Sequence, residues 1–578
     1  MLRHLNRVKK HFLCVALIGW LCPAIGAEPL RLSVYATADD VLRLILPVDR
    51  RDTLLRTLKP LRVSRVFLEG RRGDEYVSPQ LLSQARDFLA THGIQSSGGI
   101  ATVPGTTFGM RQDTPLAWLN WHSPKIQTDV AAFFAENAPV FDTLIIDDFF
   151  CTADTSPISA QARGNRDWPE YRRDLLASLL PPMVVGPARA ARSDVRLVIK
   201  FPQWYDRFHL FGYDPARFCP VFDQVWVGTE VRNPKTRRMG FVQPAEGYMN
   251  FRWLSSLTPK TAGAWFDHIE CTPENFIDQA FMSVLAGAKE LTLFHLSDLL
   301  EANPGDALLA SRITDLFALA NKLQGTERRG IAFYKPSGSD AADNLYLADY
   351  LGMIGLPILP VAYYPTNAEV VFMAAQAAAD PEVVAKTRAG LYSGKTVIMT
   401  PAFIRLAGAE AAALAGVRVD PTGSPTLANR LELGSKQVKL SSPLQIDSSV
   451  HVLKAKSKIT AGSQPTQVPI LTTIQQQRGR VLMLNLRTFS ESDFGASGEW
   501  LLAPCPLGLS DLPQDLCAVI RQAVSAPIGL AFDGPSGLAC AAFDRARCFY
   551  NFHDQAISIK LNHQRLTLPG HGWVWIEN

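Results

Sequence analysis

Concentrated positive charge is scarce in this chain beyond its first dozen residues. Charged residues make up only 19% of the 578, and the formal net charge is +4. A nucleic-acid partner requires a basic patch or stripe, so a polyanionic partner has little support. Outside the N-terminal segment no apolar run of about 18 residues occurs, so we expect no stable membrane insertion of the mature chain.

Motifs for metals and for nucleotide cofactors are also missing. The sequence has no H-x-H or H-E-x-x-H spacing, and no cysteine pair has the spacing of a metal finger. The segment Lys335–Ser339, which follows a predicted strand, has one glycine and lacks the G-x-G-x-x-G pattern. We therefore predict neither a metal site nor an organic cofactor.

The first 27 residues have the composition of an export signal. Its basic residues are Arg3, Arg7, Lys9 and Lys10, and Phe12–Leu21 is an apolar run. Ala24–Ala27 offers a cleavage site. We predict a signal peptide over residues 1–27 and a periplasmic or secreted protein, with an uncleaved N-terminal anchor as the alternative. Export permits disulfides, but a mature chain with an odd number of cysteines and this length favours structural free thiols.

Eight short aliphatic runs alternate with amphipathic stretches over residues 28–326. The runs are Leu32–Tyr35, Arg65–Leu68, Gly98–Ala101, Leu144–Asp147, Arg196–Lys200, Gln224–Val227, Gly263–Phe266 and Leu291–Phe294. Expected helices include Arg51–Leu58, Pro79–Ala90, Lys125–Glu136, Trp168–Leu180, Asn275–Ala286 and Ala307–Leu323. Such a series is typical of a (β/α)8 TIM barrel, an α/β fold.

Two further domains are predicted after the barrel. Over residues 327–525, short strands alternate with helices such as Ala341–Met353, which indicates a flavodoxin-like or amidotransferase-like α/β domain. Within it, the hydrophobic period drops to two over about residues 426–476, so we expect an antiparallel β insertion. Residues 526–578 alternate again and are rich in turns, which predicts a small C-terminal β domain.

The segment Leu144–Phe150 is the first candidate for a site. A strand buried on both faces ends there in Asp147 and Asp148. Catalytic side chains of parallel barrels lie at the C-terminal ends of strands, whereas a helix N-cap pair is the structural alternative. Because successive strand residues point to opposite sides, at most one of the two faces the barrel axis. We choose Asp148, which lies nearer the open end, and give Asp147 a supporting role.

Carboxylates follow other predicted strands as well, at Glu69, Glu230 and Asp267. Cleavage of a glycosidic bond needs one acid to protonate the leaving oxygen and a second carboxylate to attack or to activate water. We therefore predict Asp148 as one catalytic residue and Glu230 or Asp267 as the other.

Six residues are predicted to bind substrate hydroxyls or to tune the carboxylates. They are Glu69, Asp147, Lys200, Trp204, Tyr205 and His268. Aromatic faces near strand ends provide stacking surfaces for sugar rings, although barrels also bury large aromatics. Lys200 could instead form a Schiff base. A metal site built from Asp147, Asp148, Glu230, Asp267 and His268 is a further alternative that no metal-binding spacing supports.

Four segments carry a resemblance to glycosidases. Ile146–Phe150, Ile199–Asp206, Val227–Glu230 and Gly263–Asp267 look like those of uncharacterised secreted bacterial proteins with glycosidase-type barrels. The order of an acid-ended barrel, a parallel domain and a small β domain resembles the glycoside hydrolase family 42 β-galactosidases. That family has catalytic Glu residues after strands 4 and 7, where this chain has Asp147-Asp148 and Asp267.

The α-galactosidase-like barrels offer a second analogy, because their catalytic Asp residues follow strands 4 and 6, where this chain has Asp148 and Glu230. The resemblance to family 42 implies that the middle domain mediates homo-oligomer contacts or shapes the cleft. We expect a glycoside hydrolase that acts on a carbohydrate. The alternatives are a non-catalytic carbohydrate-binding protein and a metal-dependent hydrolase or lyase on the same barrel.

Overall fold

A computed structural model describes residues 30–112, 118–147, 149–461, 467–497, 505 and 507–577. The predicted signal peptide, residues 1–27, and Asp148 lie outside these residues. Among the described residues, no helix has the length and apolarity needed to cross a membrane. Cys219, Cys271, Cys517, Cys540 and Cys548 are free thiols.

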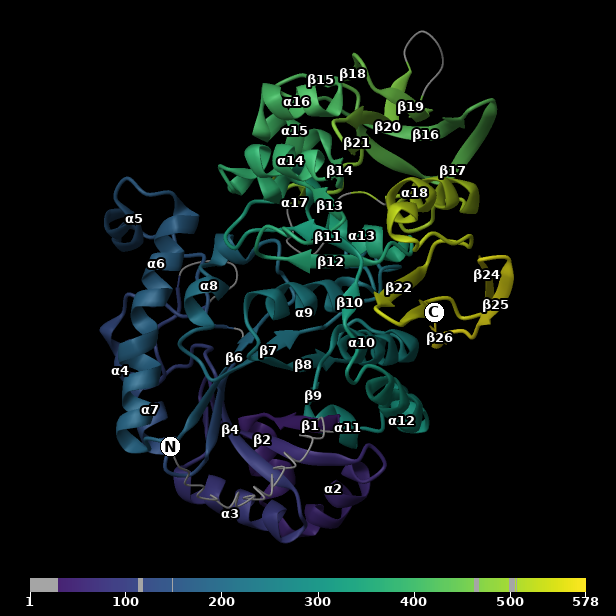
Figure 1. Cartoon of the computed structure of the whole chain (residues 1–578). Coiled ribbons are helices and arrows are strands. Elements are labelled where there is room, and N and C mark those ends of the chain that lie inside the picture. The colour runs from purple at the N-terminus through teal and green to yellow at the C-terminus, as the bar shows by residue number, and fades with distance from the viewer. Residues whose placement is uncertain are drawn as a thin grey trace, which may run out of the picture.

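Eight parallel strands form a closed barrel, which Figure 1 shows as a ring enclosed by helices. They are β1 (Arg31–Ala36), β2 (Val63–Arg72), β4 (Gln95–Ala101), β5 (Thr143–Ile146), β6 (Arg196–Phe201), β7 (Gln224–Gly228), β8 (Thr261–Asp267) and β9 (Glu290–Phe294). Pairing of β1 with both β2 and β9 closes the ring. The predicted TIM barrel is thereby confirmed. The short β3 (Glu75–Tyr76), which folds back on β2, was not predicted.

Helices follow each barrel strand. The main ones are α2 (Arg51–Leu58), α3 (Pro79–Thr91), α4 (Pro124–Asn137), α6 (Trp168–Leu180), α8 (Pro215–Phe218), α9 (Glu246–Leu257), α10 (Pro273–Ala286) and α12 (Pro304–Lys322). Several begin at a proline that follows a capping residue: Ser78 caps α3, Thr272 caps α10 and Asn303 caps α12. Proline fits the first helical position because that N–H has no partner within the helix. The sequence analysis had not predicted α9.

The barrel interior is filled by large side chains from different strands. Tyr35, Phe67, Ile145, Val198, Trp226 and Trp265 form one buried cluster. Because side chains alternate along a strand, residues two positions before or after each of these also face the axis. The interior is therefore a packed core, and a site can form only at its ends.

The middle domain is built on one continuous mixed sheet. Its parallel strands are β12 (Ile358–Val361), β11 (Ile331–Tyr334), β13 (Val370–Met373), β14 (Thr396–Met399) and β21 (Gly479–Leu484). The predicted insertion forms antiparallel strands that extend the same sheet: β20 (Val468–Gln476), β19 (Lys456–Ala461), β16 (Pro425–Leu433) and β17 (Lys436–Asp447). Helices of this domain include α13 (Leu347–Met353), α14 (Val383–Tyr392), α15 (Pro401–Ala407), α16 (Ala409–Ala415) and α18 (Gln514–Ser525).

One predicted helix of the middle domain is wrong over its first half. The stretch Ala341–Met353 was expected to be a single helix, but α13 begins only at Leu347, after Tyr346 at φ 58°. The Tyr346 N–H donates a 2.7 Å hydrogen bond to Asp206, in the loop after β6. This contact with the barrel supports a backbone conformation that residues other than glycine adopt rarely, and so overrides the helical pattern.

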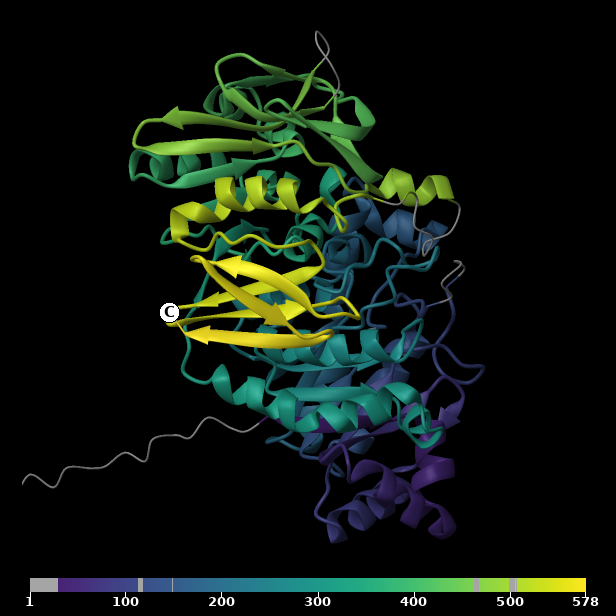
Figure 2. The ribbon, with the colours of Figure 1, turned by 90° about the vertical axis from the view of Figure 1, so that its right-hand side faces the viewer.

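The C-terminal domain is a small β structure that packs on the barrel. A sheet joins β22 (Leu538–Phe543), β23 (Ala546–Asn551) and β26 (Gly572–Glu577) to β10 (Arg328–Arg329), which belongs to the connection between barrel and middle domain. A hairpin of β24 (Ile557–Leu561) and β25 (Gln564–Leu568) lies beside it. Figure 2 shows this domain, in yellow, against the teal helices α10 and α12 and below the green middle domain.

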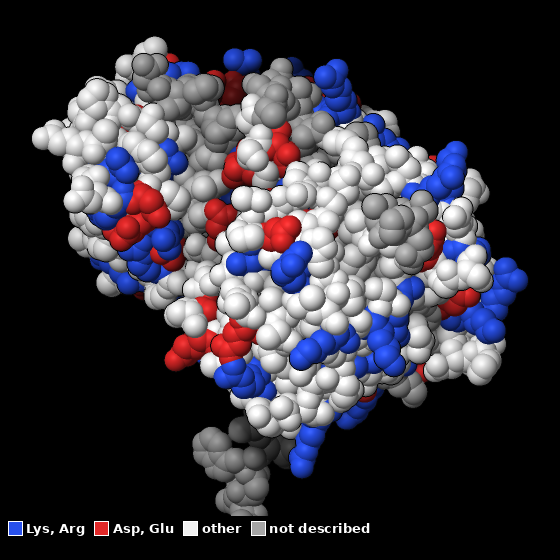
Figure 3. All heavy atoms as spheres, turned by 90° about the horizontal axis from the view of Figure 1, so that it is seen from above, with Lys and Arg blue, Asp and Glu red and all other residues white. Residues whose placement is uncertain are grey.

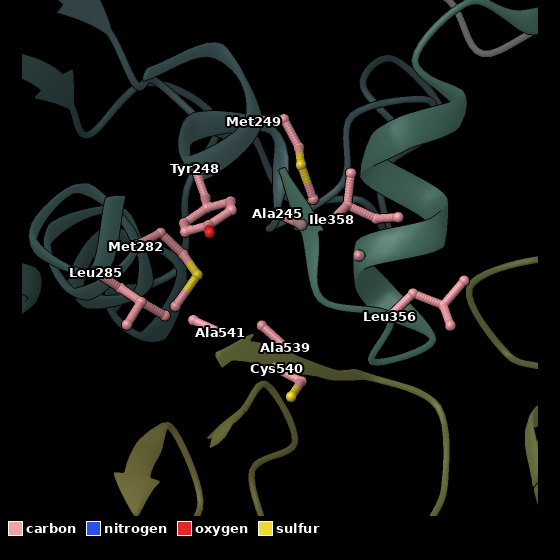
Figure 4. A pocket seen from close by; sticks show the side chains of 11 residues that line it. Ala245, Tyr248, Met249, Met282, Leu285, Leu356, Ile358, Ala539, Cys540 and Ala541 are labelled. Atoms are coloured by element: carbon pink, nitrogen blue, oxygen red, sulfur yellow. The ribbon is translucent and has the colours of Figure 1, made fainter. Parts of the chain in front are cut away.

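The three domains meet around a small apolar cavity of about 10 Å3. Figure 4 shows its lining: Tyr248, Met249, Met282 and Leu285 from barrel helices, Leu356 and Ile358 from the middle domain, and Cys540 from β22. A space this small leaves the interfaces close-packed.

The face seen in Figure 3 carries Lys, Arg, Asp and Glu intermixed, without a broad field of either sign.

Candidate active site

A layer of charged side chains lies directly above the packed interior, at the C-terminal ends of the strands. Glu69, Asp147, Lys200 and Asp267 each come two residues after an inward-facing member of the core, namely Phe67, Ile145, Val198 and Trp265. The alternation of a strand therefore turns all four toward the axis. Each is at most 4% exposed. The structure thus brings together predicted residues from four different strands.

Glu69 is held by hydrogen bonds on both of its oxygens. Arg72 donates two of 2.9 Å in a bidentate pair, Tyr35 donates its hydroxyl at 2.7 Å, and the Ala38 N–H donates at 2.8 Å. Burial raises the pKa of Glu69, and the charge of Arg72 opposes this rise. Burial alone would lower the pKa of Arg72, but Glu69 raises it. Glu69 is therefore suited to fixing its neighbours in place.

Lys200 and Glu230 form a buried ion pair beside this layer. The Lys200 Nζ donates a 2.6 Å hydrogen bond to Oε1 of Glu230, which follows β7. The ammonium also lies 4.7 Å from the ring centre of Trp265, whose face attracts cations. An adjacent cation stabilises the ionised form of a carboxyl group, which is the form that a nucleophile or general base needs. Glu230 is therefore arranged to act as a carboxylate.

Asp267 is paired with Arg232, a residue of the loop after β7. The guanidinium contacts both carboxylate oxygens, and the Nη2–Oδ2 distance is 3.1 Å. The Ile269 N–H adds a bond of 3.0 Å to Oδ1. Burial alone would lower the pKa of Arg232, but the charge of Asp267 raises it. This bidentate contact fixes the orientation of Asp267 and stabilises its charge.

Asp147 faces the interior end of the same layer. Its Oδ1 accepts bonds from the Thr102 N–H at 3.1 Å, the Thr102 hydroxyl at 3.2 Å and the Phe149 N–H at 3.2 Å. Burial and the charge of Glu69 raise the pKa of Tyr35, the charge of Arg72 opposes this rise, and the charge of Asp147 adds to it. Asp148 lies outside the described residues, so its predicted catalytic role stays a prediction.

Three other predicted residues make contacts of different kinds. Trp204 stacks on Trp118 with ring centres 6.1 Å apart. Tyr205 is 1% exposed, and its hydroxyl donates a 2.7 Å bond to Asp349 of α13, so it contributes to the interface with the middle domain. His268 stacks on Phe276 and lies 3.0 Å from Asp306 of α12, in the helical layer. His268 follows the inward-facing Asp267 and so points outward.

Sequence reasoning missed the two arginines that hold the carboxylates. Arg72 and Arg232 each lie near a strand end in sequence and contact Glu69 and Asp267 respectively. A signal was available, because a buried carboxylate needs a charged or hydrogen-bonding partner. Glu246, the first residue of α9, was not predicted either. Burial, followed by the charge of Asp349, raises its pKa well above the usual range.

A family model described as "probable glycosyl hydrolase, catalytic domain" matches residues 23–335. This match covers the whole barrel and more than half of the chain. The chain belongs to this glycosyl hydrolase family. A second model, for the second domain of the uncharacterized protein SSO3021, matches residues 326–427 in the middle domain. Among the described residues, no group of three or more His, Cys, Asp and Glu side chains could hold a metal ion.

A curated relative and three solved structures extend these matches. SSO3021 of Saccharolobus solfataricus is 23% identical over 370 residues, which are 57% of this chain and 59% of that protein. The polyextremophilic β-galactosidase of Halorubrum lacusprofundi aligns with a TM-score of 0.64 at 12% identity, over 95% of this chain and 99% of that one. The cold-adapted β-galactosidase of Rahnella sp. R3 aligns at 0.63 and 11%, over 96% and 99%. These structures show a shared fold. Gan42B, a GH42 β-galactosidase from G. stearothermophilus, aligns at a TM-score of 0.63 and 10% identity, over 96% of this chain and 98% of that one, so the predicted likeness to family 42 architecture is confirmed at the level of the fold.

Proposed function

We propose that this glycosyl hydrolase cleaves the glycosidic bond of an oligosaccharide or glycoside by a two-carboxylate mechanism at the C-terminal end of the barrel. The observation that carries the proposal is the buried Lys200–Glu230 pair within a layer that also holds Asp147 and Asp267. A carboxylate with a fixed charge is what the attacking or water-activating group requires. The family match and the fold of the β-galactosidase structures support the same reaction class.

Three aspartates are candidates for the second carboxyl group. Asp147 and Asp148 follow β5 in the sequence and Asp267 ends β8, and these strands are strands 4 and 7 of the barrel. One of the two aspartates after β5 would protonate the leaving oxygen, since Arg232 favours the charged form of Asp267, while Glu230 attacks the anomeric carbon or activates a water molecule. Lys200 would hold Glu230 in place, and Arg232 would do the same for Asp267.

The test is turnover of a panel of aryl and natural glycosides by the purified chain, with the released sugar quantified by chromatography. We expect at least one glycoside to be hydrolysed, and Glu230→Gln to lower kcat/KM by about 10^3-fold or more with the fold preserved. Asp49→Asn is the matched control, because Asp49 is 80% exposed and lies in no such cluster. Proton NMR of the first-formed anomer then distinguishes retention from inversion.

A non-catalytic carbohydrate-binding protein gives a different result. It would bind a sugar without releasing product, and Glu230→Gln would leave that binding unchanged. Hydrolysis that persists at the parental rate in Glu230→Gln would contradict the role assigned to Glu230.

A further inference from the structure

A cavity of about 1110 Å3 opens at the end of the barrel opposite the carboxylate layer. The first residues of the strands line it, including Arg31 of β1, Arg65 of β2, Arg196 of β6 and Glu290 of β9. Neither the family match nor the proposed hydrolysis assigns a role to this end. In barrels of this kind it ordinarily serves stability, so a large cavity there calls for a separate explanation.

The alternation of the strands points three arginines into this cavity. Arg65 and Arg196 lie two residues before the inward-facing core residues Phe67 and Val198. Arg31 lies two residues before Ser33, whose hydroxyl is 2.9 Å from that of Thr292, a partner of the core residue Trp226. Arginines from three strands therefore line the cavity.

Carboxylates in the cavity are too few to balance its cations. Seven of the lining residues are Lys or Arg, and three are Asp or Glu. Glu290 is shared, because it lies 3.7 Å from Arg31 and 3.5 Å from Arg65. Arg196 lies 3.9 Å from Asp142. Arg86 and Arg192 are paired with Asp87 and Asp194, which lie outside the lining, but cations still outnumber carboxylates among the other lining residues.

The guanidinium of Arg65 has a hydrogen-bond donor without an acceptor in the part of the chain that the structure describes. Its side chain is 11% exposed, and among the described residues its buried Nη1 has no hydrogen-bond partner. Burial lowers the pKa of Arg65; the charge of Glu290 opposes this change, and the charges of Arg31 and Arg196 add to it. A buried donor that lacks an acceptor is costly, so a bound anion at this point would be strongly favoured.

We propose that this cavity binds an anionic small molecule through a phosphate or sulfate ester group, contacted by Arg65, Arg31 and Arg196. Guanidiniums that approach from three strands suit an oxyanion with acceptors in several directions better than a flat carboxylate. The volume exceeds that of the anion alone and leaves room for the rest of the ligand. The hydroxyls of Ser97 and Thr143, both on the cavity wall, are further donors.

Isothermal titration calorimetry of the full chain with inorganic phosphate, sulfate and acetate tests the proposal, at ionic strength held constant with sodium chloride. We expect saturable binding of phosphate or sulfate, and much weaker binding of acetate. Arg65→Met should weaken phosphate or sulfate binding about tenfold or more, because it removes a buried charge-assisted donor. Higher salt should weaken binding by the parent chain.

Two further variants keep the result decisive. Arg196→Gln changes a side chain that is 57% exposed and serves if Arg65→Met fails to fold; it should also weaken binding. Arg43→Met removes an arginine that is 76% exposed, lies outside the cavity and should bind like the parent. The proposal fails if neither phosphate nor sulfate binds saturably, if acetate binds as tightly, or if the folded Arg65 or Arg196 variants bind like the parent.

Discussion

The Lys200 ammonium and the Glu230 carboxylate lie 2.6 Å apart, and only 3% and 5% of the two side chains are exposed. One comes from the end of β6 and the other from the loop after β7, so the pairing of neighbouring strands brings them together. Taking two charges out of water costs several kcal/mol for each ion, which a close contact in the interior offsets. A change to one partner therefore affects both stability and chemistry.

Lys200→Met should lower the free energy of unfolding by about 3 to 5 kcal/mol, because it leaves Glu230 buried without its cation. The same change should reduce kcat/KM, since the charged form of Glu230 loses its support. Urea unfolding and initial rates measure the two effects. Lys386→Met is the control, because the Lys386 side chain is 34% exposed and solvent screens its pair with Asp380. Equal losses of unfolding free energy in the two variants would show that the buried pair contributes no more to stability than the exposed pair does.

A double-mutant cycle on Arg232 and Asp267 should give a coupling energy of at least about 2 kcal/mol. Either single change, Arg232→Met or Asp267→Asn, leaves a buried polar group without its bidentate partner, whereas the double variant removes both. Chemical denaturation of the four proteins measures the coupling. If Asp267 is also catalytic, Asp267→Asn should abolish turnover even under conditions where the variant is fully folded. Additive losses of stability would contradict the pairing.

Much of the barrel could be predicted because its local signals agree. Each of the eight predicted runs overlaps an observed strand, and the bounds predicted for Arg51–Leu58 and Trp168–Leu180 are those of α2 and α6. Proline at the first helical position makes several starts readable in the sequence. The helix α9 was not predicted. Nearly all residues of its first turns are buried, so the amphipathic pattern that indicates a surface helix is weak there.

The site could be predicted only in part, because partners depend on tertiary contacts. Glu69, Asp147, Lys200 and Asp267 could be predicted because they lie at the ends of predicted strands. The alternation of side chains along a strand explains why all four face the barrel axis. By contrast, the place of Tyr205 depends on Asp349, which lies 144 residues away in the chain. No local pattern indicates that an aromatic residue after a barrel strand contacts a second domain.

Gly263→Ala should destabilise the barrel by about 1 to 3 kcal/mol through overpacking. A Cβ at residue 263 would lie 2.0 Å from Cε2 of the Trp226 indole, which is itself buried in the barrel core. Thermal unfolding measures the loss. In a Trp226→Phe background the smaller ring gives way, so the added cost of Gly263→Ala should fall by about 1 kcal/mol or more. An unchanged cost in that background would contradict the steric cause.

Docking of the C-terminal domain on α10 should weaken as the pH rises from about 6.5 to 9. The His571 Nδ1 lies 3.0 and 3.1 Å from the two oxygens of Asp278, and Nε2 lies 3.1 Å from Asp554. Tyr550 donates its hydroxyl to the same Asp278 at 2.5 Å. Burial alone would lower the pKa of His571, but the hydrogen bonds and charges of Asp278 and Asp554 raise it to about 9.

The sign of this effect follows from the raised pKa. An unfolded histidine has a pKa of about 6.5, so the stabilisation is complete below that pH and is lost as the pH rises through 9. With allowance for solvent screening we expect about 1 to 2 kcal/mol over this range. His571→Gln should remove that part of the pH dependence of Tm between pH 6 and 9.5. His563→Gln, in the turn between β24 and β25, should retain it, and a parallel loss of Tm with pH in parent and His571→Gln would exclude His571 as the cause.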